Sequence, residues 1–543
     1  MSSGAGHGTT RKDKFMDSTG PAEDTTRAGR REWIGLAVLA LPTLLLSLDL
    51  SVLFLAQPQL SADLNPSASQ QLWIMDIYAF MIAGFLVTMG TLGDRIGRRK
   101  LMLYGSAAFA VASVIAAYST TPEMLIFARA LLGIAGATLM PSTLALIMTM
   151  FTDAKQRGFA IGVWLSSFMG GMAIGPVIGG ALLGWFWWGS VFLMAVPVMV
   201  LLMVTAPVLL PEMRDPDAGR IDLLSVVLSL LAILPVVYGL KEIAQYGFSA
   251  VAGGSVLVGI VFGVLFVLRQ RTLDSPLLDL KLFRSRTLSG ALVVMLLTSA
   301  TISSSIMLFS LYLQTVRGYS AVESGLWLIP AATALIVTSL VAPKIAQKVR
   351  PAYVAAAGLL VAAAGLAVVS QVGTATSLVV VLLGFVLVQA GVGPMGSLGT
   401  EMIVGSAPEE RAGSAASVSE TSTELGVAIG VATYGTIAAA VYQNLVAVPP
   451  GVPAEAAAAA GETISGAVAA AEGLAADTGA ALLDSARAAF TSGVNTAAGV
   501  AAVILVVLAG LTVALLRHVG KTGEESPAPA DAGVAMAAER EAR

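Results

Sequence analysis

The chain has 543 residues, of which 56% are hydrophobic and only 12% are charged, and its formal net charge is −3. Soluble proteins carry about twice this charged fraction, so the composition excludes a soluble globular protein and indicates that most of the chain does not face water. The sequence contains no cysteine, which excludes disulfides, thiolate metal sites and cysteine nucleophiles, and we expect no bound metal.

The two terminal segments are polar and rich in small residues. Residues 1–32 contain no apolar core followed by a cleavage site, so they are predicted to be a disordered cytoplasmic tail rather than a signal peptide. Residues 518–543 have the same character and receive the same prediction. The GKT sequence at 520–522 is not a nucleotide-binding loop, because Leu515 stands where that motif requires glycine. An ATP-driven pump is therefore not expected.

Apolar stretches near bilayer length recur between these tails. Each is predicted to be a helix, because lipid offers no hydrogen-bond partner to open backbone groups. The sequence thus predicts an all-α integral membrane protein with fourteen spans: 33–57, 71–92, 101–118, 121–146, 157–183, 187–209, 222–241, 251–270, 287–312, 320–343, 351–371, 376–403, 412–440 and 493–517.

The distribution of lysine and arginine predicts that both termini are cytoplasmic. If the N-terminus lies inside, nearly all Lys and Arg residues outside the spans fall in cytoplasmic loops. The exceptions on the outer side are Lys241, Arg317 and Arg487, and Arg129 alone lies within a span. The chain is expected to be a multi-pass membrane protein in contact with the lipid bilayer.

An alanine-rich segment at 442–491 is predicted to be a long extracellular loop. Alanine favours helix and the glycines at 473 and 479 interrupt it, so a pair of short helices is expected. Arg487 is the only basic residue in this segment, which contains several acidic residues. Two interpretations stay open, a solvated insertion and a lid over an exit path.

Four motifs stand in or beside separate spans. They are LDLSVLFLAQPQL with Asp49 in the first span, GTLGDRIGRRK at 90–100 after the second, LIFARALLGIAGAT with Arg129 in the fourth, and GGMAIGPVIGG at 170–180 in the fifth. Together they resemble the major facilitator superfamily. Fourteen spans, the LAQP sequence and the fifth-span motif are similar to the 14-span drug/proton antiporter family, and in particular to quaternary-ammonium multidrug efflux pumps.

The resemblance implies a major facilitator fold of two six-helix bundles, at 33–209 and 287–517. Residues 210–286 are then a linker that carries the seventh and eighth spans as accessory helices. A protein of this kind binds substrate between the bundles near the bilayer midplane and works by alternating access. The resemblance also implies a secondary transporter rather than an enzyme. Such a transporter uses no cofactor and is driven by the proton-motive force.

The expected function is proton-coupled export of lipophilic, mainly cationic drugs, dyes and biocides across a bacterial inner membrane. The expected partners are the lipid bilayer, lipophilic cationic small molecules and protons, with no nucleic acid, and the transporter is expected to be a monomer. The alternative is an exporter of an endogenous lipid or natural product with incidental drug efflux.

Two glutamates, Glu420 and Glu424, lie in the SETSTELG stretch of the span 412–440. They are one helical turn apart and face the same way. Two like charges at this distance disfavour joint ionisation, so one carboxyl group is expected to be protonated when no cation is present. A lipophilic cation would let both ionise, which exchanges a cation for a proton. The alternative is solvation in an inner vestibule by Arg411 and water.

Asp49 and Asp76 are the candidate acids of the first two spans, and Arg129 lies in the same outward half. A charge at the bilayer centre costs roughly 2.5–3.5 kcal/mol on insertion scales, so an intramembrane acid is a candidate for proton exchange. We expect Asp49, Asp76 and Arg129 to couple protons. The alternatives are an ion pair that locks helices together and, for Asp76, an exposed acid at the cavity mouth. The span 320–343 has no acid beyond Glu323 at its outer edge.

Aromatic side chains near these acids can offer a flat face to a quaternary ammonium, at about 0.5–2 kcal/mol each. We therefore expect substrate to contact Tyr78, Trp164 and Tyr312 as well as the carboxylates of Asp76, Glu420 and Glu424. For any one aromatic residue, packing or a place at the membrane interface is the alternative.

The resemblance also implies gating residues. A latch that closes the cytoplasmic side is expected in the loop motif, and a bend or stiff point in the fifth span. Asp94 is expected to pair with a helix N-terminus or a nearby arginine. Plain anchoring by positive charge is the alternative for the loop. The residues concerned are Gly90, Gly93, Asp94, Arg95, Gly97, Arg98 and Arg99 in the loop, and Gly175, Pro176 and Gly179 in the span.

Overall fold

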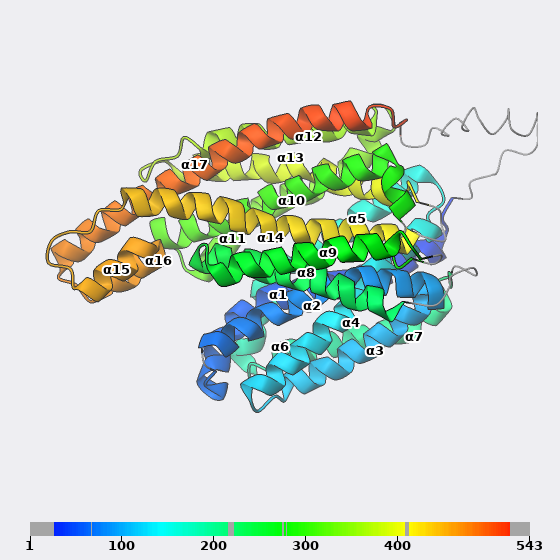
Figure 1. The fold of residues 1–543 in the computed structure, drawn as a ribbon, viewed down its shortest axis with the longest axis horizontal. Helices are drawn as coiled ribbons and strands as arrows, with labels where there is room; N and C mark the ends of the chain where they lie inside the picture. Colours follow the sequence, from blue (N-terminus) through cyan, green and yellow to red (C-terminus); the bar gives the residue numbers. More distant parts are fainter. Residues whose placement is uncertain are drawn as a thin grey trace, which may run out of the picture.

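The computed structural model describes residues 27–66, 68–214, 222–273, 276–278, 280–407 and 412–521, and every regular element in these ranges is a helix (Figure 1). Residues 1–26 and 522–543, which form most of the two predicted tails, lie outside the described residues, as does Arg411. Figure 1 shows the long helices side by side, with the start of α1 and the end of α17 at the same end of the molecule. We call this the termini end.

The first half of the chain forms one group of helices. They are α1 (Arg30–Leu64), α2 (Ala68–Ile96), α3 (Arg98–Ala117), α4 (Pro122–Met150), α5 (Ala154–Trp185), α6 (Ser190–Leu193) and α7 (Ala195–Leu209). Two further long helices follow, α8 (Leu223–Tyr246) and α9 (Ala250–Gln270), and then a short 3₁₀ helix, η1 (Leu280–Arg284).

The second half forms the other group. Its elements are α10 (Arg286–Leu311), the π-helical turn η2 (Tyr312–Val316), α11 (Ala321–Ala346), α12 (Pro351–Val369), α13 (Leu378–Val404), α14 (Ala412–Leu445), α15 (Ala454–Glu462), α16 (Ile464–Glu472) and α17 (Ala476–Leu516). Within the described ranges, 13 helical segments are long and apolar enough to cross a membrane, with α6 and α7 forming one of them. The remaining predicted span falls on α5, a 32-residue helix packed along α1. The all-helical membrane fold is therefore confirmed.

Two large hydrophobic clusters form the core. One is built by α1–α7 and also takes in Val404, Ala412 and Ala416 from the neighbouring ends of α13 and α14. The other is built by α10–α17. The halves meet along two seams, where α14 packs on α2 and α4, and where α11 and α13 pack on α5.

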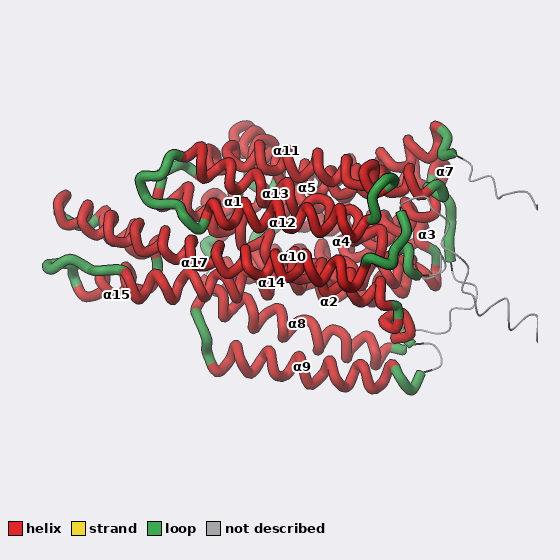
Figure 2. Tube along the Cα trace, turned by 90° about the horizontal axis from the view of Figure 1, so that it is seen from above, coloured by secondary structure: helices red, strands yellow, loops and turns green. Residues whose placement is uncertain are grey.

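Helices α8 and α9 lie along one edge of the bundle (Figure 2). They pack on each other, and α8 also packs on α2 and α14. Asp222 caps α8 by accepting a hydrogen bond from the Ser225 amide at 3.1 Å, and its carboxylate accepts another from Arg269 Nε of α9 at 2.6 Å. The hydrogen bond from Arg269 and those from Ser225 hold the pKa of Asp222 well below its usual range. This ion pair ties the two accessory helices together at the termini end.

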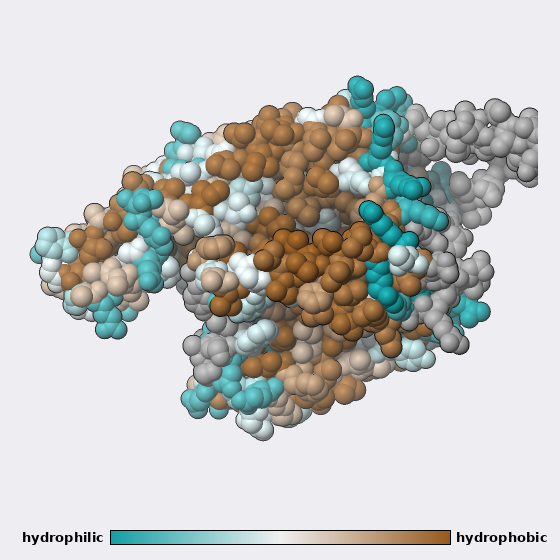
Figure 3. All heavy atoms as spheres, viewed as in Figure 1, coloured by the Kyte–Doolittle hydropathy of each residue, from teal (hydrophilic) through white to brown (hydrophobic). Residues whose placement is uncertain are grey.

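The surface has the polarity that a bilayer requires. Figure 3 shows an apolar belt across the middle of the molecule, between hydrophilic residues at both ends. Apolar side chains such as Val204, Val208, Val503 and Val507 are each more than 60% exposed. In water such a belt would be unfavourable, whereas lipid covers it without cost.

The predicted extracellular loop is shorter than its sequence indicated. The expected short helices are present as α15 and α16, but the loop does not continue to residue 491, because α17 already begins at Ala476. Residues 476–491 are apolar on one face, and Leu482, Ala486 and Phe490 join the core of the second half, which extends the helix beyond its membrane-spanning part. The short helices are also packed, since Tyr442 of α14 donates a hydrogen bond to the Ala460 carbonyl at 2.6 Å.

Candidate functional site

A buried ion pair joins α1 to α4 inside the first half. Arg129 Nη1 lies 3.3 Å from Asp49 Oδ2, and the two residues are 0% and 7% exposed. The Tyr78 ring lies 5.2 Å from the guanidinium carbon and the Phe192 ring lies 6.0 Å from it. Removing one partner of a buried charge pair is costly, so the protonation state of Asp49 affects how well the charge of Arg129 is compensated.

Unused hydrogen-bonding capacity remains at this pair. Arg129 Nε and the Tyr78 hydroxyl are buried and have no hydrogen-bond partner among the described residues. Tyr78 also interacts electrostatically with Asp49, with Arg129 and with Glu424 of the second half. Tyr78 is therefore within electrostatic reach of both the ion pair of the first half and Glu424 of α14.

Glu420 and Glu424 lie on α14 at the seam between the halves. Glu420 is 6% exposed. It interacts electrostatically with Glu424, and Glu424 interacts electrostatically with Lys241. Neither has an ion-pair partner within 4 Å in the described chain. Leu425, next to Glu424, packs against the small cluster of Phe80, Ala83 and Val237 from α2 and α8.

Glycines bring α14 close to α10 directly after the two glutamates. A side chain at Gly426 would collide with the Leu296 carbonyl, and one at Gly430 with the Ala300 backbone. This close contact with α10 leaves the other side of α14 to the first half and α8. The helix thus presents its acidic stretch where the two halves meet.

Asp76 has a partner that sequence reasoning assigned to an outer loop. Lys241 lies within α8, and its Nζ is 2.6 Å from Asp76 Oδ1. Both side chains are 32% exposed, and the ammonium also lies 4.8 Å from the centre of the Phe80 ring. The sequence showed a lysine near the end of one apolar segment and an acid, Asp76, in another. Nothing in the sequence identified α8 as the neighbour of α2.

Two of the predicted aromatic contacts lie away from the acids. Trp164 is buried between helices, and its Nε1 donates to Thr143 Oγ1 at 3.1 Å, which joins α5 to α4. Tyr312 lines a pocket inside the second half, formed by α10, α12, α13, α14 and α17, and neither glutamate is among the residues that line this pocket. Of the three aromatic residues predicted to bind substrate, Tyr78 is the one that interacts with the predicted acids Asp49 and Glu424 in the described part of the chain.

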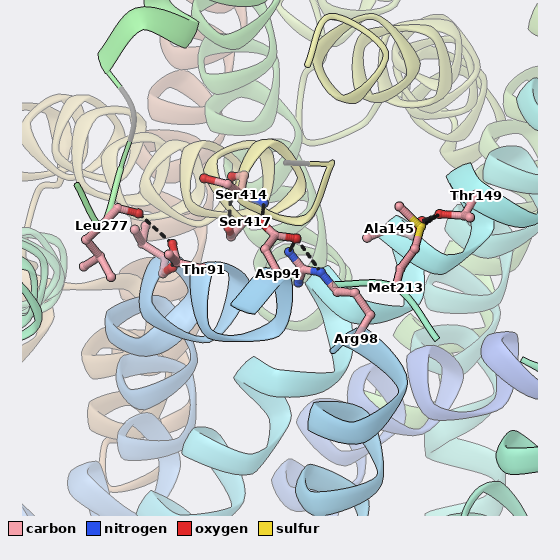
Figure 4. A network of polar contacts seen from close by, with 10 residues as sticks. Thr91, Asp94, Arg98, Ala145, Thr149, Met213, Leu277, Ser414 and Ser417 are labelled. Carbon is pink, nitrogen blue, oxygen red and sulfur yellow. Dashed lines mark hydrogen bonds and ion pairs between the residues drawn. The ribbon is translucent and has the colours of Figure 1, made fainter. Parts of the chain in front are cut away.

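The loop motif links the two halves at the termini end (Figure 4). Asp94 forms an ion pair with Arg98, whose Nε donates to Asp94 Oδ1 at 2.8 Å. The other oxygen, Oδ2, accepts a hydrogen bond from the Ser414 amide at 2.9 Å, in the first turn of α14. Both partners expected for Asp94, an arginine and a helix N-terminus, are therefore present, and the second one joins the two halves.

The other residues of the motif shape the same junction. Gly97 has a φ of 111°, a conformation that glycine adopts at little cost, and it lets α3 start directly after α2. A side chain at Gly93 would come within 2.7 Å of Arg98, and Gly90 is buried. Arg95 Nη2 lies 3.5 Å from the Pro276 carbonyl, and Arg99 donates to the Leu210 carbonyl at 2.9 Å.

The fifth-span glycines face α1. A side chain at Gly179 would come within 2.7 Å of Val52, and one at Gly171 would collide with the Leu44 carbonyl. Gly175 is buried on the same helix, and the side chain of Pro176 lies outside the described residues. The motif therefore permits close contact between α1, which carries Asp49, and α5.

A second contact between the halves was not predicted. At the seam of α5 with α11 and α13, Lys344 Nζ lies 5.4 Å from the centre of the Phe159 ring. A side chain at Gly158 would come within 2.8 Å of Pro343 and 3.1 Å of Glu401 Oε2. The signal in the sequence was VAPKIAQKVRP, a weak echo of the first-half loop motif that contains Lys344.

The junction gives a first prediction. We expect Asp94→Asn to slow transport at least about tenfold, since a hydrogen bond to a charged group contributes roughly 1.5–3 kcal/mol, while substrate affinity changes little. Initial rates in proteoliposomes and equilibrium binding in detergent measure the two quantities. Ser414→Ala is the matched control, because the contact uses its backbone amide. A large loss of affinity with normal rates would contradict a role in gating.

Comparison with known proteins places the fold in a family. The sequence profile of the Major Facilitator Superfamily matches residues 39–431. The chain belongs to this superfamily. Multidrug efflux pump LfrA of Mycolicibacterium smegmatis is 43% identical over 494 residues, which cover 91% of this chain and 98% of LfrA. Methyl viologen resistance protein SmvA of Salmonella typhimurium is 33% identical over 486 residues, 88% of this chain and 97% of SmvA.

A solved structure has the same fold. The human organic anion transporter MFSD10 (TETRAN) matches with a TM-score of 0.57 at 15% identity, over 88% of this chain and 99% of MFSD10. At this identity the likeness concerns the fold alone. The family and the relatives indicate that this superfamily member is a membrane transporter.

Proposed function

We propose that this transporter exports lipophilic cations from a bacterial cell in exchange for protons. The observation that carries the proposal is the position of Glu420 and Glu424 on α14, at the seam of the two halves, where Glu424 lies within electrostatic reach of Tyr78 and Lys241. Carboxylates at the seam that have no ion-pair partner within 4 Å among the described residues favour an organic cation over an anion or a neutral solute.

The relatives support the same substrate class. LfrA is a multidrug efflux pump and SmvA is a methyl viologen resistance protein. Methyl viologen carries two quaternary nitrogen charges, which two carboxylates one turn apart can balance. On this proposal, drugs, dyes and biocides that share a delocalised or quaternary positive charge are the substrates.

Proton coupling is proposed for the Asp49–Arg129 pair. Protonation of Asp49 would leave Arg129 buried without its carboxylate, so the two protonation states favour different packing of α1 against α4. Because α1 also packs closely on the glycines of α5, such a change reaches the seam between the halves. Asp76 is the second candidate, through its partner on α8.

The proposed orientation follows the basic residues. The termini end carries the basic loop motif and the Asp94 junction, so we assign it to the cytoplasm and the α15–α16 end to the outside. The contacts of Asp94 with Ser414 and of Lys344 with Phe159 then hold the cytoplasmic side closed. We propose a monomer that uses the proton-motive force without a cofactor.

Proteoliposomes test this function. We expect an imposed pH gradient to drive accumulation of ethidium or tetraphenylphosphonium by the purified protein, and a protonophore to abolish it. A neutral compound of similar size should not be accumulated. Transport of the neutral compound that persists in the Glu420→Gln, Glu424→Gln double variant would instead identify an exporter of a neutral endogenous compound.

A further inference from the structure

The seam between α2 and α8 contains a cluster of aromatic side chains beside an ion pair. Trp73, Asp76 and Phe80 follow one another at helical spacing on α2, so they share a face of that helix. The Trp73 ring is stacked on Tyr238 of α8, with centres 6.3 Å apart and planes at 10°. It also lies edge-on to Phe80 at 5.9 Å. We call these four residues the α2–α8 box.

Lys241 contacts two members of this box, Asp76 and Phe80. Its ammonium is 2.6 Å from the Asp76 carboxylate and 4.8 Å from the centre of the Phe80 ring. A carboxylate together with aromatic faces is the set of groups that binds quaternary ammonium and phosphonium ions. A primary ammonium gains less from the rings, because it is compact and strongly hydrated.

The box is open to a ligand. The side chains of Asp76 and Lys241 are each 32% exposed and Trp73 is 40% exposed. Lys241 lies five residues before Tyr246, the last residue of α8, which places it about 8 Å along the axis from that end of the helix. A long flexible side chain in such a position can leave the box without any change of the helices.

The box also lies close to the α14 glutamates, Glu420 and Glu424, which are proposed to bind the exported cation. Leu425 of α14 packs against Phe80, Ala83 and Val237, so the acidic stretch of α14 lies next to the box. Lys241 acts on the charge of Glu424 as well as binding Asp76. One lysine on an accessory helix thus opposes acids from both halves of the transporter.

We propose that the α2–α8 box is an outer subsite for organic cations and that Lys241 is its tethered occupant, which competes with the exported cation and promotes its release. The inference rests on the proposed export of cations and adds a role for the accessory helix α8. In the conformation described, with the cytoplasmic side closed, the lysine occupies the place that a departing cation vacates. Rebinding from outside is thereby weakened.

Equilibrium binding of tetraphenylphosphonium to the purified full-length protein tests the inference. Lys241→Gln removes the tethered charge, and we expect the dissociation constant to fall roughly five- to tenfold. Lys241→Arg keeps a cation in the box and should bind like the wild type. Adding Asp76→Asn to Lys241→Gln should cancel the gain, because the free carboxylate is then absent.

A structural role for the ion pair predicts different results. If Lys241 only fastens α8 to α2, Lys241→Gln leaves affinity unchanged or lowers it, and either result overturns the inference. Phe80→Leu, which keeps the ion pair, provides a second test should Lys241→Gln fail to fold. It should weaken binding roughly threefold or more if the ring contacts the ligand, and an unchanged affinity contradicts the box.

The two proposals fail separately. Absence of pH-driven cation transport by the wild type would refute the proposed function, but tighter binding to Lys241→Gln would still support the box. Conversely, normal transport with identical affinities for the wild type and Lys241→Gln would leave the function intact and remove the role of Lys241.

Discussion

We expect the Asp49→Asn variant to lose export against a gradient while it still lets cations equilibrate down their gradient. Asparagine has the shape of the protonated acid but cannot release a proton. A pH gradient of one unit supplies about 1.4 kcal/mol per proton, and 100 mV adds about 2.3 kcal/mol per net charge moved. Without a group that binds and releases the proton, this energy no longer drives the cycle.

The measurement is dye accumulation in proteoliposomes with and without a pH gradient, together with exchange at equal substrate concentrations. The variant should exchange substrate but not concentrate it. Removal of one partner of a buried ion pair typically costs about 3–5 kcal/mol, so folding must be measured as well. The Asp49→Asn, Arg129→Gln double variant removes both charges and is expected to recover stability but not uphill export.

That double variant separates two roles of the ion pair. If Asp49 served only to hold α1 against α4, the stable double variant would concentrate dye, and so would a stable Asp49→Asn. Uphill transport by either protein would show that Asp49 is structural and that another acid, Asp76 or one of the α14 glutamates, couples the proton.

The fold was predictable because lipid leaves few options to an apolar segment. Hydropathy predicted all of the long helices. The predicted helix boundaries differ from those of the structure mainly at polar or alanine-rich ends, as at Ala476, where α17 begins within the predicted loop. Such ends leave the membrane as continuous helix. The hydropathy of a window reports how far the apolar part extends and says little about where the helix stops.

The site was predictable only in part. Periodicity places Glu420 and Glu424 on one face, and the family resemblance identifies Asp94 and Arg129, but neither determines which helices are neighbours. Lys241 was therefore assigned to an outer loop, although it reaches Asp76 on α2. Tyr312 was grouped with the acids although it lines a pocket within the second half. These contacts depend on the packing of helices far apart in the sequence.

The acidic stretch of α14 gives the second large expected effect, which concerns the valence of the substrate. One carboxylate can balance a monocation, whereas a dication gains from both Glu420 and Glu424. At an effective dielectric constant of about 20, a charge pair at 4 Å contributes roughly 4 kcal/mol before desolvation is subtracted. The net difference should be smaller, about 1–2 kcal/mol, which corresponds to a roughly five- to thirty-fold change in affinity.

We therefore expect Glu424→Gln to weaken binding of methyl viologen, a dication, more than binding of 1-methyl-4-phenylpyridinium, a monocation of similar shape. The Glu420→Gln, Glu424→Gln double variant should lose both, and a neutral compound should be unaffected. Glu462→Gln, which changes an exposed glutamate of α15, is the matched control and should behave like the wild type. Binding constants and minimum inhibitory concentrations, with expression of each variant checked, measure the effect. Equal losses for the dication, the monocation and the neutral compound would mean that these glutamates support structure or proton coupling and do not recognise charge.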